Sequence, residues 1–326
     1  MKCISNRLVH VLLIAAICSL FLIGCKGYDL QMPYDPDSNI SAYRINSNIN
    51  ASYAKPFARD LCVVSQDINT ESAIIGTSEA AGLFDVNKHN VIYAKNANEV
   101  LPPASITKVM TALLACKYGN MEQVLTASEN VIIYEQGAQV YGLKAGDKMD
   151  LDTALHVLLM YSANDVGVLI AENLGGSIEG FADMMNREAL SLGATNTHFV
   201  NPHGLNSDEH YTTVYDLYLI FKEAMKYDKF CRIINTETYN SSYTLSDGTS
   251  KPIELVTGNR YLNGDQSTPA GVKVIGGKTG TTKAAGNCLI LLSVNDAGDP
   301  FISVVLKAND REELYGAMTS LLANIE

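Results

Sequence analysis

Three short groups of polar residues have the types and the order that serine acyl-transfer chemistry needs. Ser105 and Lys108 form an S-x-x-K pattern at the start of an apolar run. An S-x-N pattern, Ser162 and Asn164, lies in the middle of the chain, and Lys278 opens a K-T-G-T sequence near its end. A serine hydroxyl becomes a nucleophile when a base removes its proton, and a lysine held among apolar groups can have a pKa low enough to be that base. Together the groups predict a nucleophile, its base and substrate-binding polar groups.

The S-x-x-K and S-x-N patterns each occur a second time, so context must choose between the copies. Ser52 and Lys55 form the other S-x-x-K, but Pro56 follows at once and disfavours a helical Lys55. The other S-x-N, Ser128 to Asn130, lies in a polar stretch that we expect to be exposed. Neither copy has the surroundings that bring two side chains together in a buried site.

The S-x-x-K pattern of Ser105 and Lys108 has a more favourable setting. Two prolines precede Ser105, and proline fits only the first turn of a helix, so we expect Ser105 at a helix N-terminus. Lys108, three residues on, then lies on the same side. The N–H groups and positive dipole end of such a terminus suit a developing oxyanion. A capping serine followed by a surface lysine would explain this pattern alone, but the other two groups outweigh that explanation.

The other two groups also have informative settings. Ser162 and Asn164 interrupt the apolar segment 155–170, where buried polar groups need partners. Next to the serine, Ser162 could relay a proton and the Asn164 amide could hold a substrate carbonyl. Gly280 ends a strand-like run and lets another backbone come close. That geometry suits a substrate bound as an added β-strand, with Lys278 and Thr279 holding a negative group.

The remaining pattern predicts an α+β domain of three layers, α/β/α. Apolar residues at Ile106, Val109, Met110, Leu113 and Leu114 follow the spacing of a buried helix face. Two short strands are expected at 61–64 and 73–75, and a hairpin is expected from 81–86 and 91–94. Further helices are expected at 151–174, 181–192, 214–227 and 312–324. Strands at 272–279, 288–294 and 301–306 complete an antiparallel sheet drawn from both ends of the chain, with helices inserted between.

The first residues resemble an export signal. Lys2 and Arg7 form a basic region, and the apolar stretch 8–23 is short for a membrane span. The sequence Leu-Ile-Gly-Cys that ends at Cys25 resembles a bacterial lipobox, which implies lipidation of Cys25. The alternative is an ordinary secretory signal with an incidental cysteine, which would export the protein as well. We therefore expect a signal peptide at 1–25, a flexible polar tether at 26–58 and the catalytic domain at 59–326. The expected location is extracytoplasmic, at the outer face of the cytoplasmic membrane or in the periplasm, with the lipid as membrane anchor.

Composition and cysteine use exclude several classes of function. The formal net charge of −11 and the lack of a basic stripe argue against a nucleic-acid partner. Cys62, Cys116 and Cys288 lie in apolar runs, where a buried thiol is common, and no C-x-x-C occurs. We therefore expect no metal, no cofactor and no required disulfide.

In this order the three motifs resemble those of penicillin-binding proteins and serine β-lactamases. The sequences around Tyr161 to Asp165, Asn201 to Leu205 and Gly277 to Thr282, followed by A-A-G-N, are similar to the D-alanyl-D-alanine carboxypeptidase branch of low-molecular-mass penicillin-binding proteins. The resemblance covers about residues 60 to 326 and implies a β-lactamase/transpeptidase-like fold.

The resemblance also implies roles at matching positions. Ser105 would attack the carbonyl between the two terminal D-alanines of a peptidoglycan stem peptide, with Lys108 as base and Ser162 as proton relay. Asn164 would hold a substrate carbonyl. The remaining implied substrate-binding residues are Lys278, Thr279, Gly280, Thr281 and Arg311. Backbone N–H groups of the serine and of Thr281 would form the oxyanion hole, and β-lactams would acylate the same serine. Many relatives have His where this chain has Thr281, so the carboxylate contacts can differ.

Three alternatives stay open at this stage. A class A β-lactamase needs a deacylating glutamate in an E-x-x-L-N sequence, and Glu172 lacks that spacing. A D,D-endopeptidase would use the same site on cross-linked peptides. A tethered sensor would bind stem peptide or β-lactam without turnover. His203 is expected to be structural, since the mechanism already has a base.

Overall fold

The computed structural model describes residue 58 and residues 60–326. Three expected features lie outside the described residues. They are the signal segment 1–25 with Cys25, nearly all of the tether 26–58, and the S-x-x-K copy at Ser52.

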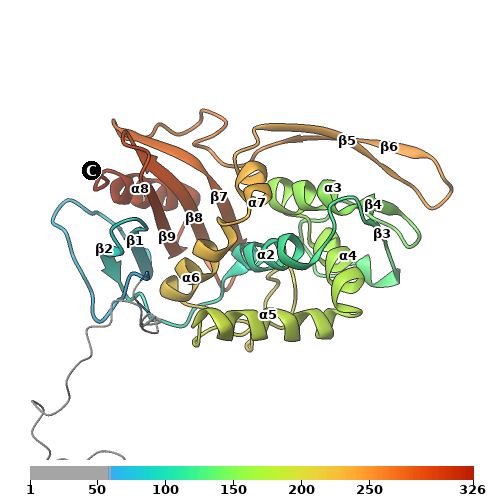
Figure 1. Cartoon of the computed structure of the whole chain (residues 1–326), viewed down its shortest axis with the longest axis horizontal. Helices are drawn as coiled ribbons and strands as arrows, with labels where there is room; N and C mark the ends of the chain where they lie inside the picture. The colour runs from blue at the N-terminus through green and yellow to red at the C-terminus, as the bar shows by residue number, and fades with distance from the viewer. Residues whose placement is uncertain (1–57, 59) are drawn as a thin grey trace, which may run out of the picture. The chain divides into compact units, whose positions relative to one another are not determined.

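A five-stranded antiparallel sheet forms the centre of the domain, and its strands come from both ends of the described chain (Figure 1). Its spatial order is β2-β1-β9-β8-β7. The bounds are β1 Ala80–Asp85, β2 Asn90–Lys95, β7 Val272–Thr282, β8 Gly286–Asn295 and β9 Pro300–Ala308. The expected hairpin and the expected three-stranded meander are therefore confirmed.

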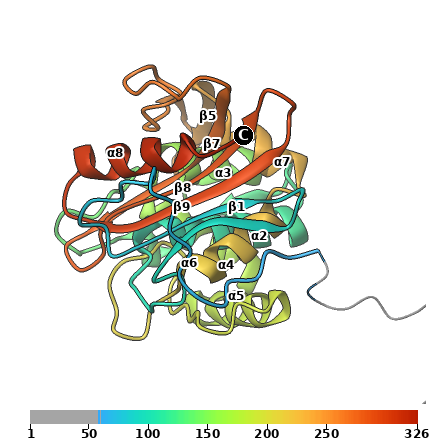
Figure 2. The ribbon, with the colours of Figure 1, turned by 90° about the vertical axis from the view of Figure 1, so that its left-hand side faces the viewer.

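Helices cover both faces of this sheet, as Figure 2 shows with α8 on one side and α2 and α6 on the other. Strand β8 explains why, because it is apolar on both faces. Leu289 and Leu291 pack with α8 (Arg311–Leu322), whereas Ile290 and Leu292 belong to the core of the helical side. Successive strand residues point to opposite faces, so each face needs its own cover. The result is the expected three-layer arrangement.

The helical side is built around α2 (Lys108–Tyr118). All eight residues from Lys108 to Ala115 are buried, so this helix is enclosed rather than amphipathic. The five apolar positions expected to face the core do so. The helices around it are α4 Asn164–Gly175, α5 Ile178–Leu192, α6 Val214–Ala224 and α7 Asp228–Ile234.

The prediction of a single helix at 151–174 is wrong, and the difference decides where Ser162 and Asn164 lie. The chain forms α3 (Leu151–His156) and then a π-helical turn η4 (Val157–Tyr161). Ser162 follows in the left-handed conformation, with φ 66° and ψ 31°, and α4 begins at Asn164. A non-glycine residue in that conformation ends a right-handed helix. The break places the S-x-N residues at a helix junction, where π-helical turns often occur near functional sites.

Two expected strands are absent and a second sheet was missed. Segments 61–64 and 73–75 form no strand. Tyr218 Oη accepts the Cys62 N–H at 3.0 Å, which uses a backbone donor that a strand would need. The missed four-stranded sheet has the order β3-β4-β5-β6. Its bounds are β3 Val124–Thr126, β4 Lys148–Asp150, β5 Thr238–Thr244 and β6 Ser250–Val256.

No helix among the described residues has both the length and the apolar character that a membrane crossing requires.

Candidate active site

Ser105 lies in a tight turn just before the central helix. The expectation placed it at the helix N-terminus, but α2 begins at Lys108, and Ser105 belongs to the 3₁₀ turn η2 (Ala104–Thr107). Side chains three residues apart eclipse in 3₁₀ geometry, so the lysine comes directly beside the serine. The Lys108 Nζ to Ser105 Oγ distance is 2.9 Å.

Lys108 is fully buried and its ammonium group has three acceptors. Besides Ser105 Oγ, it donates to Asn164 Oδ1 at 2.7 Å and to the His203 carbonyl at 2.7 Å. An ammonium has three protons, so this set satisfies it completely. Burial lowers the pKa of Lys108 well below its usual value, the nearby Lys278 charge lowers it further, and Asp165 opposes both. The neutral amine is therefore accessible as a base for Ser105.

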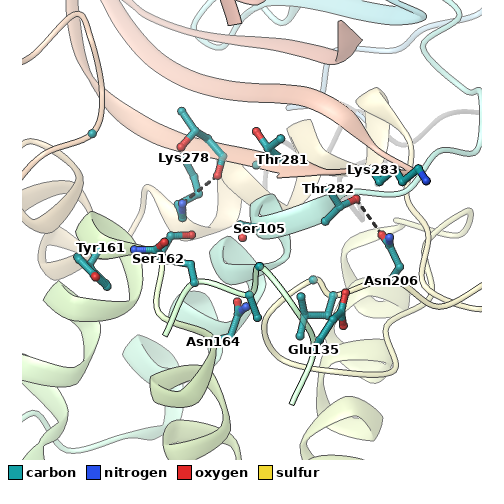
Figure 3. Close-up of a pocket in the computed structure, with 18 of the residues that line it drawn as sticks. Ser105, Glu135, Tyr161, Ser162, Asn164, Asn206, Lys278, Thr281, Thr282 and Lys283 are labelled. Atoms are coloured by element: carbon teal, nitrogen blue, oxygen red, sulfur yellow. Dashed lines mark hydrogen bonds between the residues drawn. The ribbon is translucent and has the colours of Figure 1, made fainter. Parts of the chain in front are cut away.

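The S-x-N residues lie next to Ser105 and Lys108, at the junction before α4. Asn164 is buried and uses its oxygen for Lys108, while its backbone N–H donates to the Gln139 carbonyl at 2.8 Å. Ser162 is half-buried and lines the same pocket as Ser105. Figure 3 shows Ser162 to the left of Ser105 and below Lys278.

The K-T-G strand forms the opposite wall. Strand β7 is at the edge of the sheet and pairs only with β8 among the described strands, so its other edge can accept an extended ligand. Lys278 is buried and donates to the Thr279 carbonyl at 2.8 Å. Burial lowers the pKa of Lys278 to about 7. This wall therefore carries a cation whose charge depends on pH near neutrality.

Position 280 requires a glycine because the turn that carries Ser105 packs directly against it. A Cβ added there would lie 2.9 Å from the Ser105 nitrogen and 3.1 Å from Ala104 Cβ. The backbone expected to come close to this glycine is therefore that of Ser105 itself. The contact holds strand β7 against the turn that carries the serine.

These walls enclose a pocket of about 570 Å³. It is lined by every predicted catalytic and substrate-binding residue except Lys108, which binds Ser105 from below the surface. The predicted residues that line it are Ser105, Ser162, Asn164, Lys278, Thr279, Gly280, Thr281 and Arg311. Arg311, the first residue of α8, and Thr281 are exposed at its rim.

Sequence reasoning missed a buried chain of hydrogen bonds behind Ser105. Ala104 has a left-handed backbone, with φ 48°, immediately before Ser105. Its carbonyl accepts from Thr107 Oγ1 at 2.8 Å, and Thr107 Oγ1 lies 2.8 Å from His210 Nε2. The other ring nitrogen of His210 accepts the Val200 N–H at 3.1 Å. No sequence signal links residues 103 positions apart in this way.

The protonation of the His210 ring sets the direction of each hydrogen bond in that chain. Burial lowers the pKa of His210 to about 4, and the charges of His198 and Lys108 add to this, so the ring is neutral near pH 7. Because Nδ1 accepts from a backbone N–H, the proton is on Nε2 and is donated to Thr107, whose hydroxyl then donates to Ala104. The chain therefore stabilises the unusual backbone that presents Ser105.

His203 and Asp165 do not line the pocket, but each holds a part of the chain beside it. Burial lowers the pKa of His203 to about 3, and its ring accepts the Leu205 N–H, while its carbonyl holds Lys108. Asp165 was also missed, and its carboxylate accepts three successive backbone N–H groups of residues 141–143. Asp165 thereby fixes the loop that passes beside the pocket.

The second S-x-N pattern has a structural role. Glu172 accepts from Ser128 Oγ and from Asn130 Nδ2, both at 2.6 Å. Its carboxylate is thus used to join η3 (Glu129–Val131) to α4, and Glu172 does not line the active-site pocket. A deacylating role of the class A type has no support from this residue.

The described part of the chain contains four free cysteines, Cys62, Cys116, Cys231 and Cys288. Within it, no cluster of three or more His, Cys, Asp or Glu side chains could hold a metal ion.

The family model described as D-alanyl-D-alanine carboxypeptidase matches residues 66–310. This chain belongs to that family. DacF of Bacillus subtilis, a D-alanyl-D-alanine carboxypeptidase, is 34% identical over 261 residues, which cover 79% of this chain and 64% of DacF. The D-alanyl-D-alanine endopeptidase of Escherichia coli is 28% identical over 266 residues, which cover 78% of this chain and 79% of that protein. The chain thus spans less than two thirds of the length of DacF, and the resemblance stated from the motifs is confirmed.

Solved structures confirm the fold. The crystal structure of the Streptomyces K15 DD-transpeptidase matches with a TM-score of 0.70 at 24% identity. The match covers 76% of this chain and 96% of the transpeptidase. The expected transpeptidase-like fold is therefore correct.

Proposed function

We propose that this chain is a serine-type D-alanyl-D-alanine carboxypeptidase that removes the terminal D-alanine from peptidoglycan stem pentapeptides. The observation that carries the proposal is the contact of 2.9 Å between Nζ of the buried Lys108 and Ser105 Oγ, in a pocket whose other wall is the K-T-G strand. Family membership supports the same substrate class.

In the acylation step, Ser105 Oγ attacks the carbonyl between the two terminal D-alanines and Lys108 takes the hydroxyl proton. The Oγ–C bond forms, and the C–N bond to the last D-alanine breaks. Ser162 gives its hydroxyl proton to the departing nitrogen and regains a proton from Lys108, so the proton taken from Ser105 ends on the released D-alanine. The low pKa of Lys108 supports its part, because a lysine charged near pH 7 has no lone pair to accept a proton.

Binding of the terminal carboxylate is assigned to Lys278 and Thr279, with Arg311 and Thr281 at the rim. The backbone N–H groups of Ser105 and Thr281 form the proposed oxyanion hole. The approach of Gly280 to the Ser105 nitrogen supports this, since it places the two segments side by side. Preorganised N–H donors of this kind lower the barrier by about 3–4 kcal/mol each.

Water then hydrolyses the acyl-enzyme and frees Ser105. β-Lactams are proposed to acylate the same serine, because their ring amide mimics the D-alanyl-D-alanine bond. A second candidate activity, D,D-endopeptidase cleavage of cross-linked peptides, is favoured by the similarity to the Escherichia coli endopeptidase.

Residues 1–25 are proposed to export the protein, and lipidated Cys25 is proposed to hold the domain 59–326 at the membrane through the polar tether 26–58. Each buried CH₂ of an acyl chain contributes about 0.8 kcal/mol to membrane binding, so a diacylated cysteine binds far more firmly than a single chain. Cys25→Ser should move the protein from the membrane fraction to the soluble fraction. Retention of this variant in the membrane fraction would contradict the anchor.

Covalent labelling with a fluorescent penicillin tests the proposed nucleophile. Ser105→Ala should abolish labelling, whereas Ser128→Ala, in the other S-x-N pattern, should label like the wild-type protein. Labelling of the Ser105→Ala protein at the wild-type level would refute the assignment.

A further inference from the structure

One carboxylate stands out at the end of the pocket away from Lys278. Among the described residues that line the pocket, Glu135 is the only acid, and the charged groups besides it are Lys278, Lys283 and Arg311. Its side chain is exposed, and it takes part in none of the ion pairs of the described residues. Figure 3 shows Ser105 between Lys278 and Glu135.

The backbone that carries Glu135 is fixed to the catalytic machinery. Four residues after Glu135, the Gln139 carbonyl accepts the Asn164 N–H at 2.8 Å. The backbone N–H groups of residues 141–143 donate to the Asp165 carboxylate at 2.7–3.0 Å. The loop is therefore held beside the S-x-N residues, while the exposed Glu135 carboxylate remains able to meet a ligand.

We infer that Glu135 binds a free ammonium group on the side chain of the third residue of the stem peptide. The inference rests on the proposed function, which places the terminal carboxylate at Lys278 and the scissile carbonyl at Ser105. An extended peptide advances about 3.3 Å per residue, so the residue before the attacked D-alanine lies on the Glu135 side of the serine. A long diamino side chain at that position carries its amine toward Glu135.

This subsite selects substrates by their cross-linking state. A side-chain amine that has become an amide through cross-linking has no positive charge, so it gains nothing from Glu135. The subsite therefore favours a stem peptide whose own third-residue amine is free over one whose third-residue amine has accepted a cross-link. An exposed ion pair changes affinity by about two- to fivefold, and salt weakens it.

Two peptides that differ only in this charge test the inference. Nα-acetyl-Lys-D-Ala-D-Ala has a free side-chain amine, and its Nε-acetyl derivative does not. For the wild-type protein, kcat/KM for D-alanine release should be about two- to fivefold higher with the free amine at low salt, and the ratio should fall toward one in high salt. Glu135→Gln should bring the ratio to one, and Glu135→Lys should invert it. Glu254→Gln, at an exposed position of β6 outside the pocket, should leave the ratio unchanged.

Protection of Ser105 from fluorescent penicillin by each peptide gives a second readout that needs no turnover. The subsite would be overturned if the wild-type protein released D-alanine from both peptides with the same kcat/KM and the Glu135→Gln protein did so too. The proposed function would still stand in that case. Penicillin labelling without any D-alanine release would instead refute the proposed function. In that case equal protection by both peptides would also refute the subsite.

Discussion

Replacing Asn164 should move the pKa of Lys108 in a direction set by the replacement. Asn164 Oδ1, at 2.7 Å, is one of the three acceptors that the described residues offer the buried ammonium. Leucine has a similar size and offers no acceptor, so Asn164→Leu should disfavour the charged form and lower the pKa further. Asn164→Asp places a carboxylate at the same point and should raise the pKa.

The size of the effect follows from the bond that is lost. A hydrogen bond to a charged group contributes about 1.5–3 kcal/mol, which corresponds to about a tenfold to a hundredfold change in the proton affinity of Lys108. The rate constant of acylation by a fluorescent penicillin, measured as a function of pH, reports the fraction of neutral lysine. Its midpoint should lie at lower pH in Asn164→Leu than in the wild-type protein, and at higher pH in Asn164→Asp.

A matched control separates this contact from a general change of pocket charge. Asn206 also lines the pocket, but its side chain bonds Thr282 Oγ1 at 2.8 Å rather than Lys108. Asn206→Asp should therefore shift the midpoint less than Asn164→Asp does. Shifts of the two Asn164 variants in the same direction, or no shift in either, would refute Lys108 as the base.

Three further changes test how the site is positioned. Gly280→Ala should slow acylation by about a hundredfold, since the new Cβ falls 2.9 Å from the Ser105 nitrogen; a rate near that of the wild-type protein would contradict this close contact. His210→Gln should keep most activity, because an amide can accept from the backbone and donate to Thr107, whereas His210→Leu should lower kcat more than it raises KM; equal activity of the two variants would contradict the hydrogen-bond chain. Affinity for an anionic β-lactam should weaken as pH rises above about 7, where Lys278 loses its charge, and Lys278→Arg should remove that pH dependence; a flat wild-type profile would contradict the role of Lys278.

The parts of the fold that depend on apolar periodicity could be predicted from the sequence. The α2 core positions and the strands on both sides of β9 carry strong apolar patterns that burial then confirms. Strand β5 could not be found in this way, because Thr-Tyr-Asn-Ser-Ser-Tyr-Thr has few apolar residues. Its hairpin did leave one signal, Asp247-Gly248, a dipeptide typical of tight turns.

The candidate site could likewise be predicted only in part. Side-chain types in motifs identified the residues that line the pocket, whereas contacts through the backbone left no trace in the sequence. The carbonyl of His203 that holds Lys108 and the carbonyl of Ala104 at the end of the His210 chain are examples. The helix break at Ser162 was also hidden, because the apolar spacing continues on both sides of it.

Mass analysis of a synthetic stem pentapeptide after incubation with the protein tests the proposed activity most directly. The proposed mechanism predicts that the wild-type protein shortens the peptide by one alanine and that the Ser105→Ala protein leaves it intact. An intact pentapeptide with the wild-type protein, or the same shortening by both proteins, would contradict it.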